Sequence, residues 1–151
     1  ARMGDTATLR KLLDQGHSPD LRGPYSKTLL IFAAETGQTA AVEELLKRGA
    51  HINTQDYDQY SALMWAAFNQ HLPVVELLLS HGANVNLQNR WGATALSLAY
   101  SKERKEIVHR LLAAGADVQI KDAGGKPLIS LSGIQHDLEL TKLLKAAGVK
   151  E

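Results

Sequence analysis

The chain has 151 residues, of which 44% are hydrophobic and 22% are charged, values that are ordinary for a soluble globular protein. The formal charge of +1 predicts no general affinity for nucleic acid or acidic membranes, and no run approaches the roughly 18 consecutive apolar residues that a membrane span requires. The absence of cysteine excludes disulfides and thiolate metal sites, and it leaves both reducing and oxidising compartments open.

One pattern recurs every 33 residues along the chain. Its most regular member is a glycine, found at Gly16, Gly49, Gly82, Gly115 and Gly148. Ahead of the first four glycines stand apolar residues at i, i+3 and i+4: Leu9, Leu12, Leu13; Val42, Leu45, Leu46; Val75, Leu78, Leu79; Val108, Leu111, Leu112. This spacing predicts the apolar stripe of an amphipathic helix, which the glycine ends. A period of this length indicates stacked structural repeats.

Residues 1–22 are predicted to be a partial N-terminal repeat. The segment Ala1–Gly4 aligns with Ala34–Gly37 at the 33-residue step, so we expect the given sequence to begin at the end of a first helix that is missing. The stripe Leu9, Leu12, Leu13 would then be exposed on one side, and upstream residues are expected. The alternative is a genuine half-repeat that serves as the N-terminal cap.

Residues 23–55, 56–88 and 89–121 are predicted to be three full repeats. A short helix should begin after Ser61, a favoured N-cap residue, and Thr28 and Thr94 stand at the same place in the other two repeats. A second, longer helix follows, and Pro73 falls in its first turn, where the missing N–H group matters little. Turn-forming residues after each helix pair predict a loop or a short hairpin.

Residues 122–151 are predicted to be a C-terminal capping repeat. The segment Asp122–Leu128 is one step shorter than Asn89–Leu96, so we expect its hairpin to be shortened by one residue. Lys142 and Lys145 place charge on the outer helix, as expected for a cap that faces water.

The repeat resembles the ankyrin repeat, whose pattern runs Gly-x-Thr-Pro-Leu-His-x-Ala-Ala and later Val-Val-x-x-Leu-Leu-x-x-Gly-Ala. Thr94 and Leu96 match the Thr and Leu of its opening, and Ser61 and Leu63 are a close variant. The usual Pro and His are replaced, and Ser97 is one of the residues found in place of His. The resemblance covers essentially the whole chain. It implies an all-α ankyrin-repeat solenoid of stacked helix-turn-helix units with short β-hairpin loops.

Proteins of this family commonly bind partners through the hairpin tips and the exposed ends of the inner helices. Aromatic and charged side chains, which dominate binding hot spots, recur at these places. We therefore expect a partner protein to contact Tyr25, Lys27, Tyr57, Asp58, Tyr60, Phe68, Asn69, Arg90, Trp91 and Tyr100. Asp56, Asp58 and Glu35 favour a basic or amide-rich partner. Four apolar residues near the same step are expected to pack between repeats and are left out: Phe32, Trp65, Leu98 and Leu131.

The six histidines do not predict a metal or catalytic site. They show no i, i+4 pair and no common place in the repeat, and the chain has no Gly-x-Ser-x-Gly motif. We expect a non-catalytic protein-binding module without cofactor or metal, monomeric, with no nucleic-acid or membrane partner. The alternatives are a small-ligand or enzymatic protein that uses the concave groove, and a fragment of a larger scaffold. A cytoplasmic location is favoured, with secreted and periplasmic locations left open.

Overall fold

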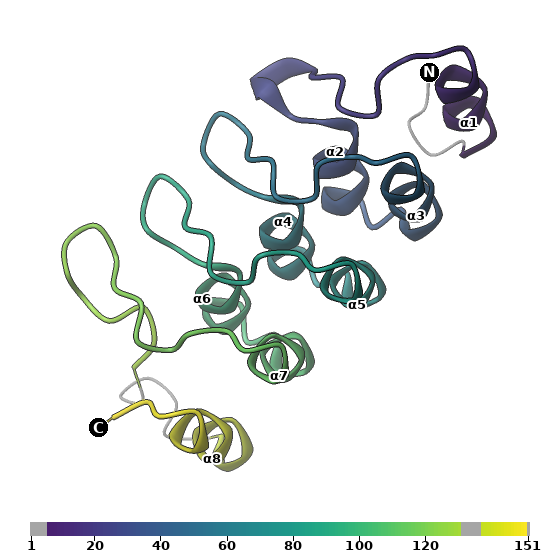
Figure 1. Ribbon diagram of the computed structural model, residues 1–151. Helices are drawn as coiled ribbons and strands as arrows, with labels where there is room; N and C mark the ends of the chain where they lie inside the picture. Colours follow the sequence, from purple (N-terminus) through teal and green to yellow (C-terminus); the bar gives the residue numbers. More distant parts are fainter. Residues whose placement is uncertain (1–5, 131–136, 151) are drawn as a thin grey trace.

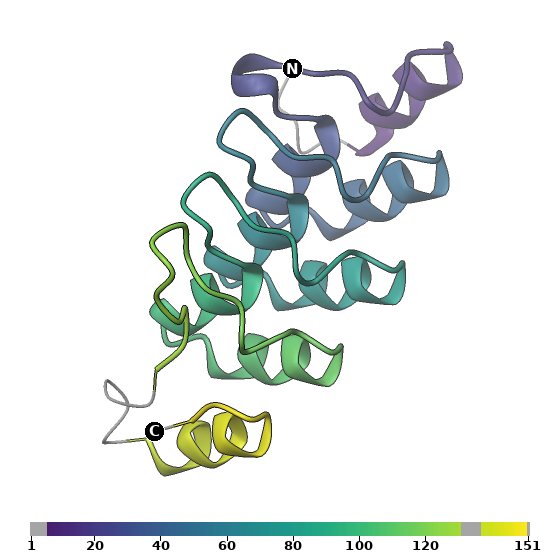
Figure 2. The ribbon, with the colours of Figure 1, turned by 60° about the vertical axis from the view of Figure 1, so that its left-hand side comes forward.

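The computed structural model describes residues 6–130 and 137–150, and its helices form two parallel rows with the loops along one side (Figures 1 and 2). The inner row consists of α2 (Leu29–Glu35), α4 (Ala62–Phe68) and α6 (Ala95–Ser101). The outer row consists of α1 (Thr6–Asp14), α3 (Thr39–Lys47), α5 (Leu72–Ser80), α7 (Lys105–Ala113) and α8 (Leu138–Ala146). Among the described residues there is no β-strand. The predicted all-helical repeat fold is confirmed.

The inner helices begin at the cap residues that the sequence predicts. The hydroxyls of Thr28, Ser61 and Thr94 each accept a hydrogen bond, at 3.2 Å, from the backbone N–H group three residues later. In α6 the Ser97 hydroxyl also accepts from the Thr94 N–H group at 2.9 Å, which completes a capping box. Ser97, which stands where the ankyrin pattern usually has His, therefore strengthens the cap of α6.

The outer helices α3, α5 and α7 end at glycines in the left-handed region. Gly49, Gly82 and Gly115 have φ angles of 81°, 79° and 84°. The N–H group of the alanine after each glycine bonds back to a carbonyl of the last helical turn, as in the bond from Ala83 to Leu78 at 3.1 Å. This arrangement satisfies carbonyls that the helix end would otherwise leave unpaired.

The hydrophobic core lies between the two rows of helices. It is built from equivalent leucines of the inner helices, such as Leu63, and of the outer helices, such as Leu78, all of which are fully buried. Ala66 and Ala67 of α4 are also fully buried. Because alanine has a small side chain, neighbouring inner helices can pack closely at these positions, and each repeat covers the apolar surface of the next.

The last hairpin is not shortened, so that prediction was wrong. Lys121 and Pro127 form an antiparallel bridge at the same register as the bridge between Gln55 and Ser61 two repeats earlier. Ile129, and not Leu128, occupies the buried position of Leu63 and Leu96. The error arose because Pro127 stands where the other repeats carry the Ser or Thr cap. Without a Ser or Thr to mark the cap, the sequence pattern favours Leu128, one residue before Ile129, as the core residue.

The two ends of the stack are less buried than its centre. In α1, Leu13 is buried whereas Leu12 is exposed, in partial agreement with the predicted open stripe. Ala1–Gly4, on which the prediction of a missing first helix depends, lie outside the described residues, as do Leu131 and His136. No helix in the described part of the chain is long and apolar enough to cross a membrane.

Candidate functional site

Three hairpin tips, at Asp56, Asn89 and Asp122, are braced by an acidic or amide side chain at their base. The Asp56 carboxylate accepts from the N–H groups of Asp58, at 3.0 Å, and Tyr60, at 2.9 Å. Asn89 accepts in the same way from the N–H groups two and four residues further on, at 3.0 and 2.9 Å. Because this contact fixes the turn internally, the residues at the tip project outward, among them Tyr57 and Trp91.

Neighbouring hairpins are linked to one another by hydrogen bonds. The Tyr57 N–H group donates to the Tyr25 carbonyl at 2.9 Å, and the Arg90 N–H group donates to the Asp58 carbonyl at 3.1 Å. The Gln88 side chain donates to its own hairpin at Gly92 and to the next hairpin at Lys121. Gln55, one repeat earlier, bridges its hairpin to the next in the same manner. The tips therefore form one connected row along the stack (Figure 1).

The first hairpin is built differently from the others. Gly23 stands where Asp56 and Asn89 stand, so no side chain at that position accepts hydrogen bonds from the N–H groups of the turn, and the tip is a short 3₁₀ turn, η1 (Pro24–Ser26). Tyr25 and Ser26 both have positive φ angles, of 58° and 57°. Each such conformation in a non-glycine residue costs on the order of 1–3 kcal/mol. This turn leaves the Tyr25 side chain almost entirely in solvent.

Trp65 of α4 joins the aromatic residues of two hairpins and one inner helix. Its ring stacks on Tyr60, with centroids 4.6 Å apart, and meets Phe68 edge-on at 6.3 Å. Tyr60 in turn contacts Trp91 at 6.1 Å. The indole N–H group of Trp65 donates to the Asp56 carboxylate at 2.9 Å, which anchors the cluster to the base of its hairpin.

Trp65 was not among the predicted contact residues. In the sequence it shares a step with Phe32 and Leu98, which made it look like an ordinary packing residue. The structure places it half-buried between the rings of Tyr60 and Phe68, which are also half-buried. The sequence feature that could have indicated this position is Asp56, nine residues earlier. A partly buried indole N–H group needs an acceptor, and the Asp56 carboxylate supplies it.

Three aromatic rings of the hairpins and inner helices, those of Trp65, Tyr57 and Phe68, each lie against a lysine or arginine side chain of the same protein. The Lys27 ammonium lies 4.1 Å from the Trp65 centroid, the Arg90 guanidinium 4.5 Å from Tyr57, and the Lys102 ammonium 4.7 Å from Phe68. We call the connected set the aromatic surface; it consists of Lys27, Tyr57, Tyr60, Trp65, Phe68, Arg90, Trp91 and Lys102. Burial raises the pKa of the Tyr60 hydroxyl, which therefore stays neutral and packs as an aromatic side chain.

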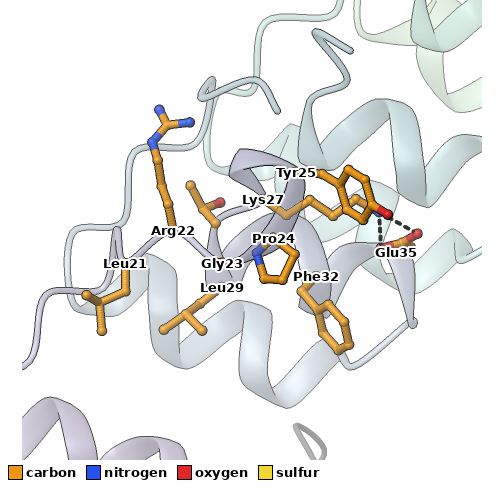
Figure 3. A pocket seen from close by; sticks show the side chains of 10 residues that line it. Leu21, Arg22, Gly23, Pro24, Tyr25, Lys27, Leu29, Phe32 and Glu35 are labelled. Atoms are coloured by element: carbon orange, nitrogen blue, oxygen red, sulfur yellow. Dashed lines mark hydrogen bonds and ion pairs between the residues drawn. The ribbon is translucent and has the colours of Figure 1, made fainter. Parts of the chain in front are cut away.

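The carboxylates beside this surface are already engaged. Asp56 is only 7% exposed and uses both oxygens internally. Both oxygens of Glu35 accept from the Lys27 ammonium at 2.7 Å (Figure 3). Asp58 lies 3.4 Å from the Arg90 guanidinium. The expected preference for a basic or amide-rich partner rested on these three groups, of which Asp56 and Glu35 are engaged within the chain, whereas the Asp58 side chain stays 44% exposed.

Models of known protein families match most of this chain. A family model described as ankyrin repeats, in three copies, matches residues 1–89, and a single ankyrin repeat model matches residues 91–123. The chain belongs to the ankyrin repeat family. Ankyrin repeats generally serve in protein–protein interaction, and the family is typically non-enzymatic. No curated protein matched the sequence.

Two residues of the predicted contact set instead tie one ankyrin repeat to the next. The Asn69 side-chain amide donates to the Glu35 carbonyl at 3.0 Å. The Tyr100 hydroxyl donates to the Ser130 carbonyl at 2.5 Å, and burial raises the pKa of this hydroxyl. Both side chains stabilise the stack and are poorly placed to be free partner contacts.

A cavity of about 440 Å³ lies beside the first ankyrin hairpin, on the face of α2 (Figure 3). Leu21, Pro24, Leu29 and Phe32 supply most of its apolar lining, and the paired Lys27 and Glu35 lie at its edge. Within the described residues there is no group of three or more His, Cys, Asp or Glu side chains that could hold a metal ion.

Proposed function

We propose that this ankyrin repeat protein is a non-catalytic module that binds a partner protein through its hairpin tips and inner-helix ends. The observation that supports the proposal is the row of exposed rings at three successive tips. Tyr25, Tyr57 and Trp91 have exposed fractions of 77%, 63% and 57%. Large apolar side chains are normally withdrawn from water, and aromatic residues are the commonest energetic anchors of protein interfaces.

The rigidity of the hairpin row also supports this function. The tips are hydrogen-bonded internally and to each other, as in the bond from Tyr57 to Tyr25. A partner that binds such a surface orders few side chains that were free before, so less of the interaction free energy is lost to conformational entropy. Tyrosine and tryptophan add large contact area with only two rotatable side-chain torsions.

The test is the double substitution Tyr57→Ala/Trp91→Ala, followed by affinity capture and quantitative mass spectrometry. We expect captured partner to fall at least tenfold, since two anchor residues are each worth about 1–2 kcal/mol or more. The far-UV circular dichroism and the unfolding midpoint should stay close to those of the wild type, because both side chains are exposed. Tyr60 is left intact because it packs on Trp65.

The matched control is Leu12→Ala/Leu138→Ala, which truncates two exposed apolar side chains on the outer helices α1 and α8. This variant should capture as much partner as the wild type. Undiminished capture by the hairpin variant, or an equal loss in the control, would refute the proposed surface.

A further inference from the structure

The ring faces of the aromatic surface leave little room for a partner's cation. Trp65, Tyr57 and Phe68 are the rings over which a lysine or arginine would stack, and each already has a cation of this chain within 4.7 Å of its centroid. An arriving cation would have to displace that group and meet its like charge. Cation–π attraction, at about 0.5–1 kcal/mol on an exposed site, does not outweigh this.

The cations of the same surface are not fully compensated. After the pairs of Lys27 with Glu35 and of Arg90 with Asp58, Lys102 has no carboxylate of the described residues within salt-bridge distance. Arg22, at the base of the first hairpin, donates one nitrogen to the carbonyls of Ser26 and Gln55 and likewise has no carboxylate partner in the described part of the chain.

Free hydrogen-bonding capacity therefore lies with Arg22, in the first hairpin, and with Lys102, over the ring of Phe68. Arg22 belongs to the loop before α2, and Lys102 caps the end of α6. The guanidinium of Arg22 and the ammonium of Lys102 each keep donors directed at solvent, since both residues are exposed. Charged donors form their shortest and strongest hydrogen bonds with carboxylates.

We propose that the partner of this module is an acidic polypeptide segment, whose Asp and Glu side chains bind Arg22 and Lys102 while its apolar residues pack on Tyr57 and Trp91. This inference rests on the proposed function and names the chemistry of its partner. The aromatic rings supply contact area, and the uncompensated cations select the sign of charge and speed association.

The test uses random peptides of fixed length, displayed on phage and selected on the immobilised protein. We expect the enriched pool to carry more Asp and Glu and a more negative mean charge than the starting library. A synthetic peptide from that pool should bind about tenfold more weakly at about 300 mM than at about 50 mM sodium chloride, because exposed charges are screened.

Lys102→Glu tests the assigned cation, and Lys142→Glu is its matched control. Both lysines are exposed, and Lys142 lies on the outer helix α8. We expect Lys102→Glu to weaken binding of the acidic peptide about tenfold and Lys142→Glu to change it less than about twofold. Arg22→Gln, which keeps hydrogen-bond donors but removes the charge, should weaken binding about threefold.

The outcomes separate this inference from the function on which it rests. A neutral or basic enriched pool, or equal effects of Lys102→Glu and Lys142→Glu, overturns the acidic partner and leaves the binding module standing. Acidic peptides that still bind Tyr57→Ala/Trp91→Ala place the contact elsewhere and also overturn the inference. Tighter binding of a random single-stranded oligonucleotide than of the peptide assigns the cations to nucleic acid instead. The absence of any enrichment over bare support overturns both proposals.

Discussion

The centre of the stack is buried more completely than its two ends, where ion pairs add to the apolar contacts with the neighbouring repeat. In the central repeats, side chains such as Leu63 and Leu78 are withdrawn from water on every side. At the N-terminal end, the buried Glu44 carboxylate of α3 accepts from Arg10 of α1 at 2.8 Å and from Arg48 at 3.0 Å. At the C-terminal end, Lys105 of α7 forms an ion pair with Asp137 at the start of α8.

This difference shows where the stack opens first. Apolar burial is worth about 25 cal/mol per Å² and surrounds the central side chains on every side. An ion pair whose cation is exposed, as Arg10 and Lys105 are, contributes about 0–1 kcal/mol. The end helices also leave apolar side chains in solvent, as Leu138 shows with 76% exposed. We therefore expect α1 and α8 to open locally before the centre unfolds.

The largest predicted effect compares one truncation at two equivalent positions. Leu78→Ala, in the centre, should lower the free energy of unfolding by about 3 kcal/mol, because the surrounding repeats cannot close the cavity. Leu144→Ala, in α8, should mainly release that helix. Urea unfolding followed by the fluorescence of Trp65 and Trp91 should shift for the first variant and hardly at all for the second. An equal shift would show that the stack unfolds as a single unit.

Two glycines at equivalent positions allow a central hairpin to be compared with the last described one. Gly92 has a φ angle of 81°, and an added Cβ would lie 2.8 Å from the Ala123 nitrogen and 2.9 Å from the Asp122 Cα of the next hairpin. Gly92→Ala should therefore cost about 2–3 kcal/mol, from backbone strain together with a displaced neighbour.

Gly125, in the last described hairpin, is the matched control. It has a similar φ angle of 78°, but an added Cβ meets nothing within 4 Å. Gly125→Ala should cost only the strain, about 1 kcal/mol. If chemical denaturation gave the two variants the same stability, the close contact between hairpins would contribute nothing.

A smaller effect is expected from the residue that braces each tip. Asp56→Ala removes an acceptor for two N–H groups and for the Trp65 indole, and should cost about 1–2 kcal/mol, since the donors are left partly buried. Asp122→Ala, in a hairpin that faces solvent, should cost about 0.5 kcal/mol. Near-UV circular dichroism should report loosening of the aromatic surface in the first variant alone.

The smallest predicted effect is a pH dependence confined to the ends. The hydrogen bond from Arg10 is the main cause that lowers the pKa of Glu44, and the hydrogen bond from Lys105 does the same for Asp137. Because the folded pKa lies below the unfolded value, this stabilisation is complete above about pH 5 and is lost as the pH falls toward the folded pKa.

Amide hydrogen exchange at several pH values measures this loss. Exchange within residues 6–14, corrected for the intrinsic rate, should speed up as the pH falls from about 5 to about 3, while α4 stays protected. Glu44→Gln should leave the same residues less protected at neutral pH and nearly insensitive to acid. Acid-induced opening that began in α4 would contradict the proposed division between centre and ends.

The repeat frame was readable from the sequence because its signals are local. Ser61 caps a helix with its own hydroxyl, and Gly82 ends one with its own backbone. The candidate site was only partly readable. Tyr25, Tyr57 and Trp91 were expected at the tips and are exposed there, but whether they bind a partner stays a prediction. The role of Trp65 and the engagement of the nearby carboxylates depend on contacts between repeats.

By itself the sequence determined the period, the helix pairs, their caps and the positions of the turns, because each depends on residues within one or two helical turns of each other. Only the tertiary structure decided which charged side chains of the aromatic surface remain available to a partner. Lys27 lies above Trp65 of the following repeat, and Asp56 is shielded from water by its own hairpin and that ring. A side chain's availability depends on its neighbours in space, and in a stack of repeats these lie about 33 residues away in the chain.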